Sequence, residues 1–166
     1  GPESPTRLWR QTNRLEFVDA TEGAGFDDTF FGIGATAGDI DGDGDVDVLL
    51  TGRSGCHLYR NDGTGSFEQS IQFLAPKCSS SATFVDYDLD GDLDLFVCRY
   101  ADISLNPDKE CRDPAGRLEL CGPTAHPALH DLLLSNDGTG TFTDVSVQHG
   151  LDRVAAAGLG VVVDDF

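Results

Sequence analysis

The feature that most constrains the fold is an aspartate-rich loop that occurs twice in the same register. Residues 39–47 read DIDGDGDVD and residues 86–94 read DYDLDGDLD, an offset of 47 residues (Asp86 against Asp39). Each loop follows a short run of small or apolar residues and precedes an apolar, partly β-branched run. Because these runs are short and bounded by aspartate and glycine, they indicate strands rather than helices. The loop therefore predicts a repeated strand–loop–strand unit.

A second unit alternates with the acidic loop. Residues 58–67 (LYRNDGTGSF) match residues 133–142 (LLSNDGTGTF), and residues 8–17 keep the same spacing from leucine to phenylalanine. Asn-Asp-Gly is typical of a tight turn between antiparallel strands, because Asn and Gly accept a positive φ. The combined repeat predicts four strands with a period of roughly 40–50 residues, which is typical of the blades of a β-propeller.

The predicted fold class is therefore all-β, with propeller blades of four antiparallel strands. Propellers need roughly 4–8 blades to close, so the ring is expected to be incomplete in this chain and to be closed by other chains or missing blades. Gly1-Pro2 is typical of a cleaved tag, so residues 1–7 are interpreted as a tag remnant or N-terminal extension. The propeller segment, residues 8–166, divides into a half blade at 8–21, a blade at 30–72, a blade at 80–148 with an insertion at 100–130, and the start of another blade at 158–166.

The two acidic loops predict two calcium sites. Calcium takes six to eight oxygen ligands, often from alternating residues of one tight loop, and ten crowded carboxylates would repel one another without a cation. We expect four side-chain donors and one backbone carbonyl donor from each loop. The side-chain donors are Asp39, Asp41, Asp43, Asp47, Asp86, Asp88, Asp90 and Asp94, the carbonyl donors are Asp45 and Asp92, and a truncated third site is expected to begin at Asp165.

Other cation-binding motifs fit the loops less well. An EF-hand needs a bidentate glutamate at loop position twelve, where this chain has Leu50 and Val97, and it needs flanking helices. Magnesium is disfavoured because it requires a small octahedral site and retains its waters. A zinc site at His126 and His130 with Cys111 and Cys121 would have an unusually long cysteine spacing.

The overall charge excludes some classes of partner. The formal net charge is −18, with 29 acidic and 11 basic residues, so the chain should repel nucleic acid and anionic membranes. The longest apolar run, residues 154–163, contains two glycines and is about half the length of a membrane span. No nucleophile elbow, phosphate loop or dinucleotide fingerprint is present, so we expect no catalytic residues and no enzymatic activity of the chain itself.

These motifs resemble a known repeat family. Residues 31–39 (FGIGATAGD), followed by the acidic loop, resemble the FG-GAP repeat of integrin α-chain propellers. The similarity is closer to the VCBS-type FG-GAP-like repeats of secreted proteins of the cartilage acidic protein (ASPIC/UnbV) type, on residues 84–88, 92–98, 58–65 and 121–123. Thr51-Gly52-Arg53 stands where the integrin motif has its second half, a departure from that pattern. The resemblance implies a propeller, calcium, an extracellular setting and interaction roles.

The cysteines and the insertion suggest an interaction surface. On an up-and-down blade, all five cysteines map to the face opposite the acidic loops. In an extracellular protein disulfides are expected, with Cys111–Cys121 favoured and Cys56–Cys78 a weaker choice, although spacing does not settle the pairing. A stapled loop on a rigid scaffold is a typical binding site. We expect a protein partner or glycan at this face, and we expect Trp9 and the repeat phenylalanines to pack between blades.

Three functions are compatible with the sequence. The first is an extracellular calcium-binding propeller module for protein–protein interaction, adhesion or scaffolding, in which calcium is structural. The second is the propeller domain of a carbohydrate-binding or carbohydrate-active protein. The third is an accessory subunit that completes a larger secreted or periplasmic assembly.

Overall fold

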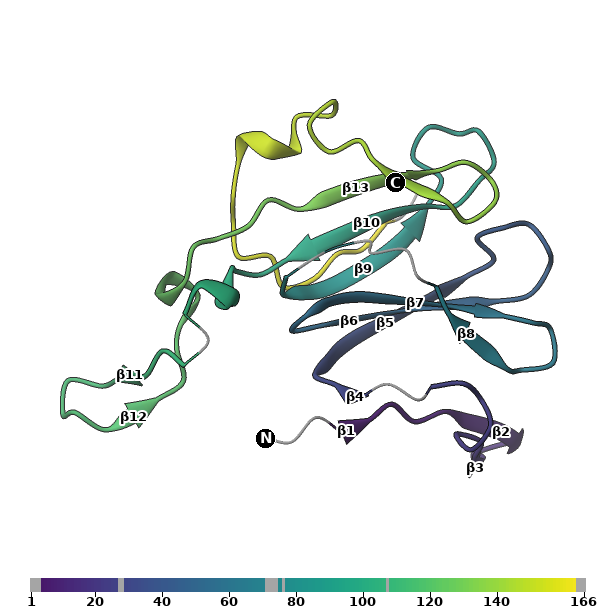
Figure 1. Ribbon diagram of the computed structural model, residues 1–166, viewed down its shortest axis with the longest axis horizontal. Coiled ribbons are helices and arrows are strands. Elements are labelled where there is room, and N and C mark those ends of the chain that lie inside the picture. The colour runs from purple at the N-terminus through teal and green to yellow at the C-terminus, as the bar shows by residue number, and fades with distance from the viewer. Residues whose placement is uncertain (1–3, 27–28, 71–74, 76, 107, 164–166) are drawn as a thin grey trace.

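The computed structural model describes residues 4–26, 29–70, 75, 77–106 and 108–163 (Figure 1). Within these ranges the chain forms short β-strands and three single-turn 3-10 helices, and no α-helix. The strands are β1 (Ser4–Pro5), β2 (Trp9–Asn13), β3 (Glu16–Asp19), β4 (Thr29–Phe30), β5 (Gly32–Gly38), β6 (Asp47–Gly52), β7 (Gly55–Asn61), β8 (Phe67–Gln69), β9 (Ser79–Val85), β10 (Asp94–Arg99), β11 (Cys111–Arg112), β12 (Leu118–Glu119), β13 (Leu132–Asn136) and β14 (Phe142–Asp144), and the 3-10 helices are η1 (Ile103–Leu105), η2 (Pro123–Ala125) and η3 (Leu151–Arg153).

Two four-stranded antiparallel sheets dominate the fold. The first has the order β5-β6-β7-β8 and the second the order β9-β10-β13-β14. In each sheet the acidic loop joins the first two strands and the Asn-Asp-Gly turn joins the last two, as the repeats predict. This confirms the predicted all-β fold class with blade-like sheets of four antiparallel strands.

The main core lies between the two sheets. Adjacent residues of a strand point to opposite faces, so Leu49 faces the second sheet whereas Leu50 faces the N-terminal segment, and both are buried. The cluster between the sheets contains Ile40, Leu49, Cys56, Leu58, Ala75, Leu95, Val97, Leu132, Leu134 and Phe142. The cluster on the other face of the first sheet contains Ala24, Phe26, Leu50 and Tyr59, with Leu8, Val48 and Phe67 packed against it. Burial on both faces explains why the inner strands are continuously apolar.

The insertion forms an arm that leaves the sheets at the end opposite the acidic loops (Figure 1). An isolated β-bridge between Ala101 and Ala128 closes its base, and the Asp102 amide donates to the Pro127 carbonyl at 2.8 Å. The arm, residues 102–127, contains η1, η2 and the short β11–β12 pair, and the Cys111–Cys121 disulfide joins its two halves. The arm is therefore held at its base by the β-bridge and between its two halves by the disulfide.

Two sequence expectations fail, one at Cys56 and Cys78 and one at Trp9. The predicted Cys56–Cys78 disulfide is wrong: Cys56, Cys78 and Cys98 are free and buried, and Cys56 belongs to the apolar cluster between the sheets. The predicted Cys111–Cys121 disulfide is present, and it excludes the disfavoured zinc site because it consumes both thiols. Trp9 does not pack between blades, since it remains 54% exposed.

Candidate metal centres

The two acidic loops have closely similar backbones. The φ angle at the fourth position is positive in both, 73° at Gly42 and 63° at Leu89. The sixth position is again left-handed, at Gly44 (93°) and Gly91 (100°). Only glycine adopts this region without cost, so Leu89 holds the same bend at an energetic penalty. The loop geometry therefore survives a change of residue at the fourth position.

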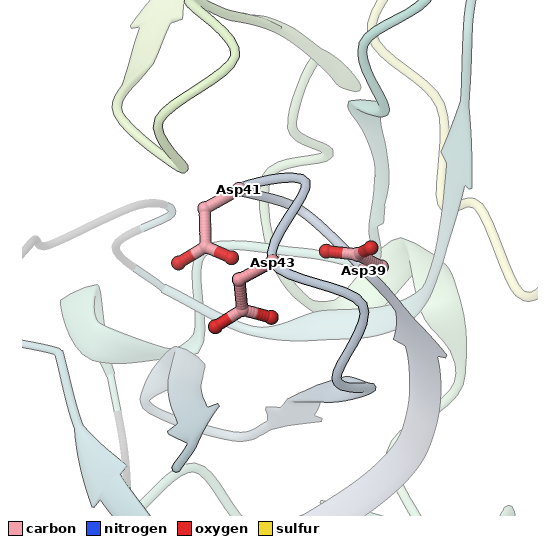
Figure 2. A group of neighbouring side chains, drawn as sticks. All are labelled: Asp39, Asp41 and Asp43. Carbon is pink, nitrogen blue, oxygen red and sulfur yellow. The ribbon is translucent and has the colours of Figure 1, made fainter. Parts of the chain in front are cut away.

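In the first loop, the carboxylates of Asp39, Asp41 and Asp43 gather on alternating residues (Figure 2). One ligand atom from each lies within 4.8 Å of the others, which can hold a metal ion. The Asp39 carboxylate also organises the loop, because it accepts the amides of Gly42 and Gly44, each at 2.9 Å.

In the second loop, a corresponding cluster consists of Asp86, Asp88 and Asp94. Asp86 accepts the Gly91 amide at 3.1 Å, which repeats the contact between Asp39 and Gly44. The two clusters share loop positions one and three and differ in the third member. Position five contributes in the first loop and position nine in the second.

Asp47 and Asp94, at position nine, are tied to the backbone. Asp47 is 1% exposed, and its two oxygens accept the amides of Ile40 and Asn61 at 3.2 and 2.9 Å. Asp94 is 0% exposed and accepts the amides of Tyr87 and Asn136 at 3.1 and 2.9 Å. Each residue thus links its acidic loop by hydrogen bonds to the start of the Asn-Asp-Gly turn of the same sheet.

The surroundings of Asp47 and Asp94 disfavour the ionised form of both carboxyls. Burial raises the pKa of both carboxyls, the amide hydrogen bonds oppose that shift, and neighbouring aspartates raise it further. The neighbours are Asp41 and Asp43 for Asp47, and Asp88 and Asp90 for Asp94. A bound cation would favour the ionised form of every one of these groups.

Asp45 and Asp92 lie against the Asn-Asp-Gly turns and belong to neither three-residue cluster. A Cβ added at Gly63 would clash with the Asp45 carboxylate, and one added at Gly138 would lie 2.6 Å from Asp92 Oδ2. Glycine is thus needed in both turns for close approach of the acidic loop.

Two buried oxygens test whether a cation fits. Asp41 Oδ1 and Asp86 Oδ1 are buried and accept no hydrogen bond within the described part of the chain. A buried carboxylate oxygen without a partner is costly. One such oxygen occurs in each cluster, and every ligand atom is a carboxylate oxygen, the donor type that hard divalent cations prefer. The residues present therefore fit a cation such as calcium.

Two residues that link the acidic loops to other elements were not identified from the sequence. Arg60 Nη1 donates to Asp41 Oδ2 at 3.0 Å, and Nη2 donates to the Thr139 carbonyl of the other sheet at 2.7 Å. The Asn136 side-chain amide donates to the carbonyls of Ile40 (2.7 Å) and Leu93 (3.0 Å). The signal available for Asn136 was its recurrence in the repeat as Asn61; Arg60 has serine at the same place in the second copy.

The C-terminal end is where the sequence predicted the start of another blade and a truncated third site. Residues 158–163 are in no strand, although Gly158 donates its amide to the Arg99 carbonyl at 3.1 Å. Asp165, at which a third site was predicted, lies outside the described residues.

Comparison with known families matches part of the chain. Residues 39–97 match the family model described as FG-GAP-like repeat. The match supports an FG-GAP repeat family. It begins at the first residue of the first acidic loop and ends in β10, so it spans both candidate centres. Neither the curated proteins nor the solved structures gave a match to the chain. No helix among the described residues is long and apolar enough to cross a membrane.

Proposed function

We propose that this chain is an extracellular calcium-binding β-propeller module that mediates protein–protein interaction, with calcium in a structural role. The observation that carries the proposal is the pair of buried, unpartnered oxygens, Asp41 Oδ1 in the first cluster and Asp86 Oδ1 in the second. The FG-GAP-like repeat across residues 39–97 supports an interaction module.

A structural role for calcium follows from what surrounds the clusters. Asp39 and Asp86 already accept loop amides, and Asp47 and Asp94 tie the loops to neighbouring strands. A cation held there would offset carboxylate repulsion and fix the turn between the first two strands of each blade. In this proposal the chain has no catalytic role of its own.

The stapled arm is the proposed contact surface for a protein partner. It leaves the opposite end of the sheets from the acidic loops (Figure 1) and exposes Leu105 (70%), Leu118 (63%) and Leu120 (96%). Apolar side chains on a segment held by a disulfide lose less entropy on binding than those on a free loop. The Cys111–Cys121 disulfide is compatible with the proposed extracellular setting.

The calcium part of the proposal is tested by thermal unfolding in calcium, in magnesium and in a chelator. Calcium at about 100 times its Kd should stabilise the folded state by about 2.7 kcal/mol for each occupied site. Asp41→Asn and Asp86→Asn should each reduce this gain. An unfolding curve that is identical in calcium and chelator would contradict the proposal.

The interaction part is tested by deletion of the arm, residues 102–127. Since the arm contributes no residue to the two core clusters of the described chain, the sheets should remain folded. Partner capture from an extracellular matrix extract should then be lost, while calcium stabilisation is retained. Undiminished capture by the deletion variant would rule out the arm as the contact surface for the partner.

A further inference from the structure

The N-terminal β2–β3 hairpin repeats the outer half of the second sheet. Trp9 lies opposite Asp19 as Leu134 lies opposite Asp144, an offset of 125 residues. The hydrogen bonds at the open end of the hairpin also repeat at this offset. The Leu8 amide donates to Thr21 Oγ1 at 2.9 Å, as the Leu133 amide donates to Ser146 Oγ at 3.0 Å. The Thr21 amide in turn donates to Asp19 Oδ1 at 3.0 Å, as the Ser146 amide donates to Asp144 Oδ1 at 2.9 Å.

The hairpin lacks the inner strand that its counterpart has. β13 pairs with β10, whereas β2 pairs within the described chain with β3 alone. The burial of equivalent side chains differs accordingly. Trp9 is 54% exposed and Leu134 is 3% exposed; Phe17 is 55% exposed and Phe142 is 7% exposed. The β2 edge is thus an unfilled position of a blade.

A cavity marks the place of the missing acidic loop. Between the two complete sheets, the acidic loop of the first packs on the turn of the second: a Cβ at Gly140 would meet Arg60 and Ile40. A Cβ at Gly65, the equivalent glycine of the first sheet, would meet nothing within 4 Å. Instead, a cavity of about 610 Å³ lies there, lined among others by Trp9, Arg10, Thr64 and Gly65.

Arg10 is the basic residue of this cavity, which is also lined by Asp19 and Glu22, and its place in the repeat indicates what it would pair with. Arg60 joins Asp41 of its own acidic loop to the Thr139 carbonyl of the next sheet. Arg10 occupies the same register position in β2, opposite Val18 as Arg60 is opposite Glu68. Thr64 is the equivalent of Thr139 by alignment of the two turns. The cavity therefore has the basic residue and the turn, and lacks the aspartate loop between them.

We propose that the β2 edge and this cavity bind a β-hairpin of the chain's own acidic-loop type, with the pattern of β5–β6 or β9–β10. Its second strand pairs antiparallel with β2, in the register in which Leu95 lies opposite Leu134. The aspartate at its third loop position pairs with Arg10, and the apolar residue at its second position fills the cavity beside Gly65. This completes the blade by strand addition and does not depend on the identity of the bound cation.

The test adds the hairpin to the full chain. A copy of residues 32–52 is fused through a flexible Gly/Ser linker in front of residue 1, which gives it a high effective concentration at β2. This copy contains neither Trp nor Cys, and Trp9 is the one tryptophan of the chain, so its emission reports the site directly. The expected result is a blue shift of Trp9 emission and slower exchange of the Gln11 amide.

Two variants and one control sequence make the result specific. Arg10→Glu in the fused chain should remove the blue shift, whereas Arg14→Glu, the same charge change at an exposed site in the turn of this hairpin, should leave it. Residues 32–52 in scrambled order should produce no shift. The inference is overturned if the fused chain shows no blue shift, if the scrambled copy shifts Trp9 equally, or if Arg10→Glu behaves like Arg14→Glu.

Discussion

The side-chain amide of Asn136 donates a hydrogen bond at 2.7 Å to the carbonyl of Ile40, 96 residues earlier in the chain. This contact joins the Asn-Asp-Gly turn of the second sheet to the acidic loop of the first. Asn136 is 5% exposed, and its Oδ1 also accepts the Gly140 amide at 3.0 Å. The candidate metal centre of the first sheet is thus hydrogen-bonded to the second sheet.

Asn136→Ala should destabilise the fold by about 2–4 kcal/mol, because it removes three hydrogen bonds and leaves buried carbonyls unpaired. Asn61→Ala is the matched control, since Asn61 donates to Val46 (3.2 Å) and accepts from Gly63 (3.1 Å) at an exposed site. Its cost should be about 1 kcal/mol. Equal losses in chemical denaturation would show that the link between sheets contributes nothing.

The left-handed residue Leu89 provides a second test. Leu89→Gly should stabilise the protein by about 0.5–1 kcal/mol, because a leucine at φ 63° is strained and its side chain is 85% exposed. Gly42→Leu should cost a similar amount, since a Cβ there meets no atom within 4 Å and only the backbone is strained. Urea unfolding in the presence of a chelator measures both; changes of the same sign would contradict the account.

Removal of the staple should affect the arm alone. Cys111→Ser with Cys121→Ser opens a loop with a sequence separation of 10 residues, and should increase protease cleavage within residues 102–127. The unfolding midpoint of the sheets should change little. Cys56→Ser is the contrasting variant, because it places a hydroxyl in the apolar cluster between the sheets and should lower that midpoint. A large loss of midpoint in the double variant would show that the arm supports the core.

The base of the arm should be sensitive to acid. Lys77, and then Ser104, hydrogen-bond the Asp102 carboxylate and hold its pKa below the ordinary value of 3.8. A depressed pKa in the folded state means that the stabilisation is complete above the ordinary pKa and is lost as the pH falls through the folded value. The protection factor of the Asp102 amide should therefore be constant from about pH 5 to 8 and decrease below about pH 4. Asp102→Asn should lack this dependence; the same profile in the variant would exclude Asp102 as its origin.

The sequence predicted the parts of the fold that repeat. Both acidic loops, both Asn-Asp-Gly turns and the strands beside them recur in register, so their existence followed from period and turn chemistry alone. What the sequence did not predict depends on where side chains point. Position nine carries an aspartate in both loops, but the hydrogen bonds that bury Asp47 and Asp94 become visible only in the folded structure.

The prediction of a Cys56–Cys78 disulfide failed for a related reason, whereas that of Cys111–Cys121 is confirmed. Cys56 and Cys78 both lie at the end of the sheets away from the acidic loops, which topology predicts. However, spacing contains no information on side-chain direction, and Cys56 points into the apolar cluster between the sheets. Cys111 and Cys121 were easier to pair because both belong to one insertion, outside that core.

The most direct test of the central claim is a calcium titration followed by NMR at the amides of Gly44 and Gly91, which donate to Asp39 Oδ2 and Asp86 Oδ2. We expect both signals to shift and saturate, each with a Kd on the order of 10⁻⁴–10⁻³ M or lower. Asp41→Asn should remove the response of Gly44 and leave that of Gly91. If neither amide responds at millimolar calcium, or if magnesium produces the same saturation, the proposed calcium centres are contradicted.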